Sequence, residues 1–247
     1  MFRFKQFVVH QDRTAMKVGT DGVLLGAWFV TDAAAPRILD VGTGTGLIAL
    51  MAAQRYPTAI VDAIDIDREA ATQAAENAAA SPFANRVVVT KCDLKEFVAN
   101  APSNCYDTIV CNPPFFVNSL RCPDNARTAA RHTDTLSHHA LVECASRLLK
   151  ECGTINLVLP FSTENPIFSI LVEHNFVVER VTNVYSTPSS ELPKRLLIAA
   201  RYQPNGCADN TTKSQSTPIT DNLVIEEARH QYTAEYIALT HDFYLKM

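Results

Sequence analysis

The sequence contains no long apolar run. Hydrophobic residues make up 47% of its 247 positions, yet no stretch approaches the ~18 consecutive apolar residues that a membrane-spanning helix needs. Residues 1–17 show no apolar segment followed by small residues, so we expect no secretory signal peptide. These absences exclude a membrane-spanning helix and predict a cytoplasmic protein.

Regular metal-ligand spacings are also missing. The seven cysteines are scattered and no two stand at C-x₂-C spacing, so we expect reduced thiols and no metal site. The histidines at 132, 138 and 139 have no cysteine or carboxylate at ligand spacing in the sequence. We expect them at the surface or hydrogen-bonded in the core.

A strong positive charge is absent. The formal net charge of −4 excludes a bulk electrostatic attraction to nucleic acid, but it leaves room for a local basic surface. The basic residues that we expect on one face fall into an N-terminal group and a later group: Arg3, Lys5, Arg13 and Lys17, then Arg121, Arg127 and Arg131.

Short β-branched runs alternate with helical patterns through the middle of the chain. Strands are expected at residues 37–41, 59–66, 86–92, 106–111, 154–160, 176–186 and 194–203. Helices are expected at residues 46–56, 68–80, 135–152 and 163–175. We therefore predict a Rossmann-like, doubly wound α/β sheet of about seven strands, mostly parallel. The last two strands lack a helix between them, so we expect an antiparallel strand at one edge.

One domain is expected over residues 1–247, with an N-terminal extension at 1–30. Residues 204–222 are polar and rich in Asn, Thr, Ser and Pro, which predicts a flexible insertion. An amphipathic helix is expected after it, because apolar side chains recur at spacings of three and four. They are Tyr232, Tyr236, Leu239 and Phe243. Nothing indicates an obligate dimer, so we expect a monomer.

A glycine-rich loop, DVGTGTG at residues 40–46, follows the first predicted strand. Its three glycines allow a tight turn and a close approach to a ligand. The pattern is not G-x-G-x-x-G, because position 47 is Leu, and it is not a Walker A loop. Asp65 ends the next strand and can accept both hydroxyls of a ribose, and Asp93 follows the third strand. Alternatively, the glycines serve only a packing turn and the aspartates cap helices.

The tetrapeptide Asn112-Pro113-Pro114-Phe115 comes directly after the fourth predicted strand. The prolines make the backbone rigid, and the Asn112 side-chain oxygen and the Pro113 carbonyl can accept hydrogen bonds from one planar NH₂ group. Such bonds favour a nitrogen with an available lone pair, and Phe115 can stack on a base. The pattern predicts methyl transfer to an amino group. The alternative is a strand-ending turn with a core phenylalanine.

These motifs resemble those of S-adenosylmethionine (SAM) methyltransferases with an (N/D)PP(Y/F) motif. Together with residues 2–28, the stretch ARHTDTLSHHAL and the C-terminal YTAEYIALTHDFYL, they resemble the bacterial tRNA1(Val) (adenine(37)-N6)-methyltransferase family. The resemblance covers nearly the whole chain except residues 204–222. It implies N6-methylation of adenosine 37 in a tRNA, with SAM as cofactor and tRNA as partner.

The resemblance also implies residue roles. Catalysis falls to Asn112, Pro113, Pro114 and Phe115. Cofactor binding is expected at Lys17, Thr20, Asp40, Gly42, Gly44, Gly46, Asp65, Ile66, Asp93 and Asn112. Substrate binding is expected at Phe115, Phe116, Arg127 and Arg131. Other interpretations remain for two of these places, since Thr20 or Asp21 could cap a helix and the arginines could be solvated.

Alternative activities share the same motif. They are methylation of a glutamine amide in a protein and methylation of an amino group in ribosomal RNA or DNA. The amide enzymes usually carry a separate N-terminal helical domain, whereas the first strand here starts by residue 37. An oxidoreductase that uses NAD, or a non-enzymatic nucleotide-binding module, is disfavoured by the missing G-x-G-x-x-G and by the presence of NPPF.

Overall fold

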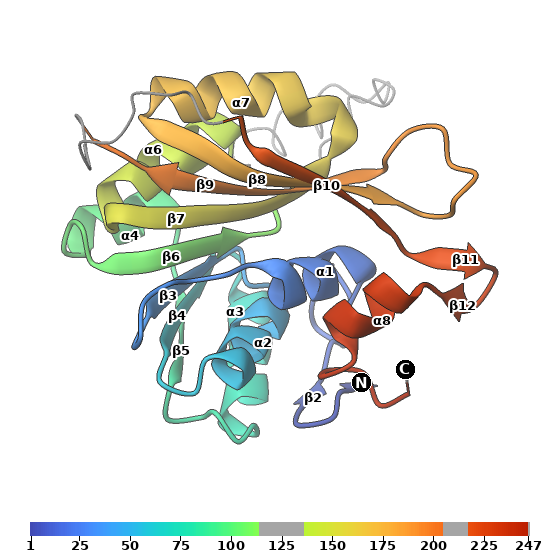
Figure 1. Ribbon diagram of the computed structural model, residues 1–247. Coiled ribbons are helices and arrows are strands. Elements are labelled where there is room, and N and C mark those ends of the chain that lie inside the picture. Colours follow the sequence, from blue (N-terminus) through green and yellow to red (C-terminus); the bar gives the residue numbers. More distant parts are fainter. Residues whose placement is uncertain (114–135, 205–216, 247) are drawn as a thin grey trace, which may run out of the picture.

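The computed structural model describes residues 1–113, 136–204 and 217–246. Its centre is a sheet of eight strands (Figure 1). In spatial order they are β10 (Ile219–Val224), β8 (Phe176–Tyr185), β9 (Arg195–Tyr202), β7 (Leu149–Pro160), β6 (Tyr106–Cys111), β3 (Arg37–Val41), β4 (Ile60–Asp65) and β5 (Val87–Lys91). Neighbours are parallel except at β9, which is antiparallel to β7 and β8.

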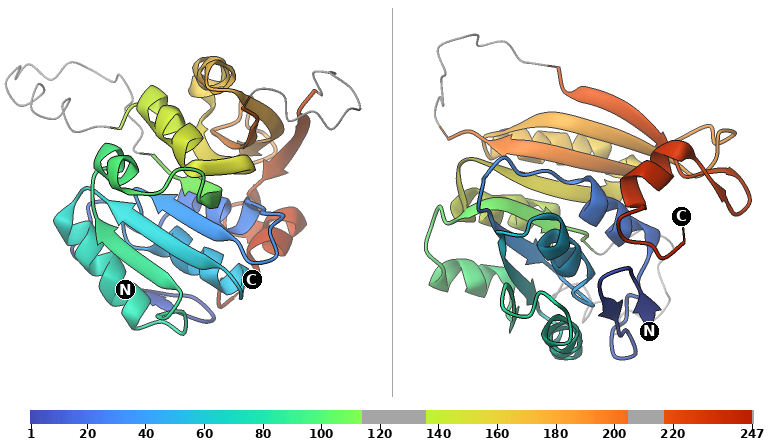
Figure 2. Two further views of the ribbon diagram at one scale, coloured as in Figure 1. Left: turned by 90° about the vertical axis from the view of Figure 1, so that its left-hand side faces the viewer. Right: turned by 60° about the horizontal axis from the view of Figure 1, so that its bottom comes forward.

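Helices cover both faces of the sheet (Figures 1 and 2). On one face, α1 (Thr20–Trp28), α2 (Leu47–Arg55) and α3 (Arg68–Ala79) share a buried apolar cluster with the strands. On the other, α4 (Leu94–Asn100), α6 (His138–Leu148) and α7 (Glu164–Glu173) share a second cluster. A 3₁₀ turn, η1 (Phe161–Thr163), precedes α7. The predicted doubly wound α/β class is confirmed.

The predicted edge position of the antiparallel strand is wrong, and the sheet has one strand more than the expected seven or so. The sheet has eight strands, and β9 lies inside it, because β10 extends the sheet beyond β8. Residues 219–222, predicted as part of the flexible insertion, belong to β10. This strand is polar because it is a half-exposed edge: Asp221 accepts a hydrogen bond of 2.8 Å from Arg180 of β8. Residues 205–216 of that insertion lie outside the described residues.

The predicted helix at 135–152 is shorter in the structure. Ser137 caps α6 by accepting a hydrogen bond from the Ala140 amide, and the helix ends at Leu148. Leu149 takes an extended conformation and pairs with Tyr106 of β6, so β7 begins five residues before the expected strand at 154. The pairing of neighbouring strands overrides local helix propensity here.

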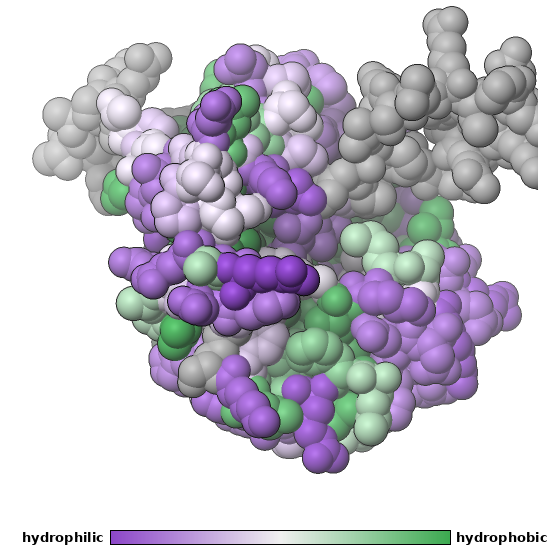
Figure 3. All heavy atoms as spheres, turned by 90° about the vertical axis from the view of Figure 1, so that its right-hand side faces the viewer, coloured by the Kyte–Doolittle hydropathy of each residue, from purple (hydrophilic) through white to green (hydrophobic). Residues whose placement is uncertain are grey.

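The two ends of the chain pack together (Figure 2). A short hairpin, β1 (Phe2–Arg3) and β2 (Val8–Val9), bridges to the C-terminal segment through Phe4 and Tyr244. The C-terminal segment contains β11 (Glu226–Ala228), β12 (Gln231–Tyr232) and α8 (Ala234–Thr240). The helix is shorter than predicted, but Tyr236 and Phe243 are buried. Figure 3 shows the outer face of this region as mostly hydrophilic, with small apolar patches.

The glycine loop turns sharply between β3 and α2. Gly42, Gly44 and Gly46 have φ values of 69°, 57° and 82°, a region that side chains with a Cβ rarely adopt. Asp40 lies fully buried beneath the turn, where its Oδ2 accepts hydrogen bonds from the Thr43 hydroxyl (2.6 Å) and the Ala49 amide (3.1 Å). Burial raises the pKa of Asp40 to about 7.

Among the described residues no helix is long and apolar enough to cross a membrane.

We expect Phe243→Ala to lower the free energy of unfolding by about 3–5 kcal/mol, because it removes a buried ring of the C-terminal segment from the apolar cluster that also contains Phe4 and Phe7. Chemical denaturation measures this change. Leu245→Ala is the matched control, since its side chain is 53% exposed, and we expect a change within about 0.5 kcal/mol. Equal losses in the two variants would contradict the docking role of Phe243.

We expect Asp40 to make stability fall as the pH rises. Its pKa is about 7 in the folded protein against 3.8 when unperturbed, so the folded state holds its proton more tightly. The contribution to stability is present at low pH and is lost as the pH rises through about 7. Asp40→Asn removes this titration. Unfolding free energies measured from pH 5 to 8 should therefore fall more steeply for the wild type, by on the order of 2 kcal/mol; parallel curves would contradict it.

Candidate active site

Two adjoining cavities lie at the carboxyl ends of β3, β4 and β6. One has a volume of about 240 Å³ and the other about 330 Å³. Both are lined by Met16, Gly42, Gly44 and Asn112, so the glycine loop and the end of β6 separate them. The position is the switch point of the sheet, because β4 and β6 flank β3 on opposite sides. Crevices at such points bind ligands in doubly wound folds.

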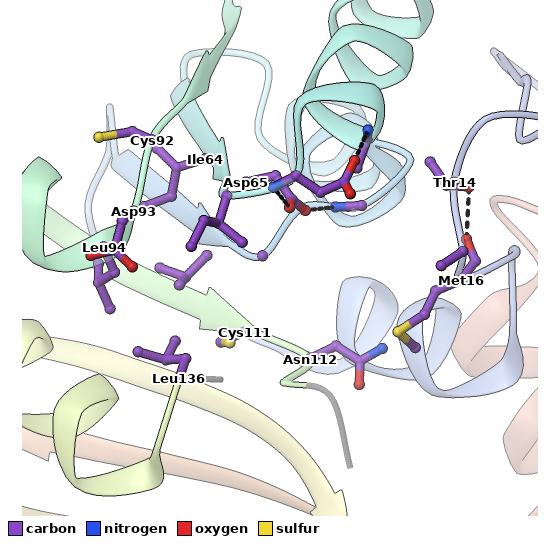
Figure 4. Close-up of a pocket in the computed structure, with 17 residues that line it drawn as sticks. Thr14, Met16, Ile64, Asp65, Cys92, Asp93, Leu94, Cys111, Asn112 and Leu136 are labelled. Atoms are coloured by element: carbon purple, nitrogen blue, oxygen red, sulfur yellow. Dashed lines mark hydrogen bonds between the residues drawn. The ribbon is translucent and has the colours of Figure 1, made fainter. Parts of the chain in front are cut away.

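The smaller cavity is largely apolar, and three aspartates line it: Asp65, Asp67 and Asp93 (Figure 4). Asp65 accepts hydrogen bonds from the Gly44 amide at 2.8 Å and from the Asp67 amide at 2.9 Å. Burial raises the pKa of Asp65. Asp93 accepts a hydrogen bond of 2.8 Å from the Lys95 amide and caps α4. Asp93 therefore both caps α4 and lines the cavity. Ile66 adds an apolar side chain to the lining and is 48% exposed.

The larger cavity is more polar than the smaller one and faces the first turn of α1. Gly19 is the N-cap residue and no side chain caps this helix, so the expected capping role of Thr20 or Asp21 is wrong. Asp21 instead accepts a hydrogen bond of 2.8 Å from Arg195 Nε, which comes from the start of β9. Uncapped amides at the start of a nine-residue helix favour an anionic group.

Asn112 stands at the junction of the two cavities. It follows β6 directly, and its Oδ1 is buried with no hydrogen-bond partner among the described residues. A buried acceptor without a partner costs about 1–3 kcal/mol, so this oxygen is suited to receive a ligand's N–H group. Pro113 beside it is buried. Pro114, Phe115, Phe116, Arg127 and Arg131 lie outside the described residues, as does Arg121.

The remaining predicted cofactor residues have different places. Lys17 and Thr20 line the larger cavity, and Lys17 Nζ donates hydrogen bonds to the carbonyl oxygens of Gln11 and Thr14. Asp40 and Gly46 line neither cavity. Asp40 holds the loop from beneath, and a Cβ at Gly46 would lie 3.3 Å from the Cβ of Ala74. These two positions shape the loop rather than its ligand-facing surface.

Sequence reasoning missed several lining residues. Thr14, Ala15 and Met16 bring the N-terminal segment onto the smaller cavity, and Arg195 reaches the larger one. No local pattern marks these residues, because each meets the site only through long-range packing. A group formed by His139, Glu173 and His174 also arises only by folding; it lies on α6 and at the end of α7, away from both cavities.

Comparisons with known proteins show the family and the fold. A family model described as the methyltransferase small domain matches residues 19–183, and it implies SAM as the cofactor. A predicted O-methyltransferase from Agrobacterium tumefaciens has a TM-score of 0.67 at 20% identity and covers 90% of this chain and 96% of its own. A ribosomal protein L11 methylase from Lactobacillus delbrueckii subsp. bulgaricus has a TM-score of 0.51 at 20% identity, with 74% and 77% covered. These two structures show the fold.

Sequence relatives are more specific. A protein of Parabacteroides distasonis is 49% identical, and the match covers 100% of this chain and 98% of the relative. A protein of Flavobacterium psychrophilum is 44% identical, with 100% of both chains covered. Both relatives are named tRNA1(Val) (adenine(37)-N6)-methyltransferase. At this identity over the full length, the chain belongs to the tRNA1(Val) (adenine(37)-N6)-methyltransferase family.

Proposed function

We propose that this protein methylates N6 of adenosine 37 in a valine tRNA with SAM as the methyl donor. The observation that carries the proposal is the unpartnered Oδ1 of Asn112 at the junction of two cavities. An exocyclic amino group supplies the N–H donor that this oxygen lacks. The names of the relatives support adenosine 37 of this tRNA as the target.

The residues at the cavities fit SAM. The smaller cavity offers Asp65 for ribose hydroxyls, Asp93 for an adenine amino group, and Ile66 as an apolar contact. The larger one offers the glycine loop and the uncapped first turn of α1, which suit the carboxylate of a methionine moiety. Asn112 would then stand next to the methyl group. When bound, SAM supplies a methyl group on a positively charged sulfur, which is the electrophile of the reaction.

The protein's part in the chemistry is to orient the target nitrogen. Asn112 Oδ1 and the Pro113 carbonyl accept the two amino hydrogens and direct the nitrogen lone pair toward the methyl group. Bound SAM would supply the methyl group and would leave as the neutral thioether, and the nitrogen would release one proton to solvent after the N6–carbon bond has formed. No strong general base is needed, because the proton leaves after the nitrogen has become cationic.

The RNA side of the site is assigned from the family resemblance. We propose that Phe115 and Phe116 stack on the target adenine, which must leave its stack in the anticodon loop, and that Arg127 and Arg131 contact phosphate. We also propose that the chain acts as a monomeric single domain in the cytoplasm.

The activity of Asn112→Ala tests the proposal. We expect the variant to lose at least about 10²-fold in kcat, because the target nitrogen is no longer oriented, while SAM binding stays within a few-fold. The assay incubates the protein with methyl-labelled SAM and with bacterial tRNA that lacks this modification, followed by nucleoside analysis for N6-methyladenosine. Asn100→Ala is the matched control, since Asn100 is exposed at the end of α4.

A release factor assayed in parallel distinguishes tRNA methylation from the main alternative, methylation of a glutamine amide in a protein. Label in that protein and none in tRNA would move the chain to the glutamine amide methyltransferases. Wild-type activity on tRNA that Asn112→Ala retains would contradict the assigned role of the motif. Labelling of neither substrate, with SAM bound, would leave the cofactor assignment in place and overturn the target.

Asp65→Ala tests the cofactor cavity separately from catalysis. We expect the dissociation constant for SAM to rise by about 10-fold or more, because the ribose loses its carboxylate partner. The turnover measured at saturating SAM should change little, since Asp65 does not face the target nitrogen. Isothermal titration calorimetry gives the binding constant. Asp32→Ala is the control, because the Asp32 side chain is 83% exposed outside the cavities; equal binding by the Asp65 variant would contradict the assignment.

A further inference from the structure

We infer that Asn77 is a positioning residue that fastens the N-terminal segment of residues 10–18, here called the strap, across the cofactor cavity and to the glycine loop at the same time. This inference rests on the proposal that the cavity binds SAM. It adds that SAM affinity depends on a side chain that lines neither cavity. Asn77 acts on the cofactor only through the strap and the loop.

The side-chain amide of Asn77 uses its oxygen as an acceptor and its nitrogen as a donor of two hydrogen bonds. Its Oδ1 accepts a hydrogen bond from the His10 amide at 2.9 Å. Its Nδ2 donates to the His10 carbonyl and to the Thr45 carbonyl, both at 2.8 Å. Asn77 is 1% exposed, so water does not compete for these bonds. Thr45 belongs to the glycine loop and His10 to the strap, so one side chain joins two segments that lie 35 residues apart in sequence.

Hydrogen bonds between its own residues hold the strap in one conformation. Lys17 Nζ binds the Gln11 and Thr14 carbonyl oxygens, and the Gln11 side chain accepts a hydrogen bond of 2.7 Å from the Val18 amide. Thr14 donates to the Met16 carbonyl at 2.8 Å. Because of these bonds, fixing His10 also fixes the positions of Ala15 and Met16, which line the cavity.

The same face of α3 supports both sides of the cavity. Gln73, one turn before Asn77, accepts a hydrogen bond of 3.3 Å from the Arg13 amide of the strap. Between them, Ala74 packs against Gly46, where a Cβ on the glycine would come within 3.3 Å. All three positions are buried. Helix α3 therefore sets the distance between the strap and the glycine loop, which are the two walls that a cofactor touches.

An acid cannot replace the amide at this position. Asp at 77 keeps the acceptor for the His10 amide but loses both donors, and its second oxygen would face the carbonyls of His10 and Thr45. In the ionised form three acceptors then meet without a hydrogen between them, and a protonated Asp restores only one of the two donors, so either form loosens the strap from the loop. A cofactor that binds to the loosened strap must order it, so the affinity falls while the geometry at Asn112 is retained in the complex.

We test this with Asn77→Asp in the full-length protein. The dissociation constant for SAM by calorimetry is expected to rise at least about 10-fold, and kcat at saturating SAM to stay within about 3-fold. Asn100→Asp, the same change at an exposed asparagine on α4, is expected to bind like the wild type. An unchanged SAM affinity in Asn77→Asp would overturn the inference, and a wild type that does not bind SAM would overturn the cofactor assignment together with it.

Two further readouts separate the strap from general destabilisation. Hydrogen exchange of the protein without SAM should quicken at the amides of His10 and Arg13 and stay slow in β4. In a double-mutant cycle, Met16→Ala should weaken SAM binding less in the Asn77→Asp background than in the wild type, because the strap has already been released. Additive effects, or faster exchange spread over the whole sheet, would overturn the inference. Gln73→Ala, which removes one strap bond, is the second variant if Asn77→Asp does not fold, and a Kd like the wild type would contradict the inference there too.

Discussion

The position of β3 between two parallel neighbours is the constraint on which the site depends. The chain runs from β3 outward to β4 and β5, then returns to place β6 on the other side of β3. The helices that follow β3 and β6, α2 and α6, lie on opposite faces of the sheet, and a crevice lies at its carboxyl edge. The glycine loop and Asn112 follow these two strands directly, so the crevice receives the glycine loop and the catalytic asparagine of the proposed mechanism from its own strand ends.

Two polar features of this crevice have no side-chain partner among the described residues. Asn112 Oδ1 is buried and unpartnered among the described residues, and α1 begins without a side-chain cap. Asp67 caps α3 and Thr233 caps α8, whereas α2 and α7 also begin without a side-chain cap, and Gln54 Oε1 and Asn156 Oδ1 are also buried without a partner among the described residues. At the crevice the chemical preference of these groups is definite, because an unpartnered acceptor favours an amino group and a positive helix end favours an anion. Both preferences fit the proposed transfer of a methyl group from SAM to the amino group of a base.

The walls of the crevice come from parts of the chain that are far apart in sequence. The strap crosses from the N-terminal region and is held by α3, while Arg195 of β9 reaches back to Asp21 at the start of α1. The C-terminal segment packs against the N-terminal hairpin and thereby anchors the region from which the strap departs. If the strap sets the affinity for SAM, as inferred above, packing at both ends of the chain would contribute to that affinity, whereas the proposed chemistry takes place at the sheet edge.

The sequence by itself determined the α/β class, the glycine loop, the acidic residues after β4 and β5, and the asparagine after β6, because each depends on short-range periodicity or on a motif next to a strand end. It did not reveal β10, whose polar residues match an edge strand and a loop equally well, nor the early start of β7, which comes from pairing with β6. Only the tertiary structure decided that Asp40 supports the loop from beneath, that Arg195 meets Asp21, and that Asn77 joins the strap to Thr45. Those contacts join residues through side-chain geometry after the sheet has assembled, and no local pattern in the chain encodes them.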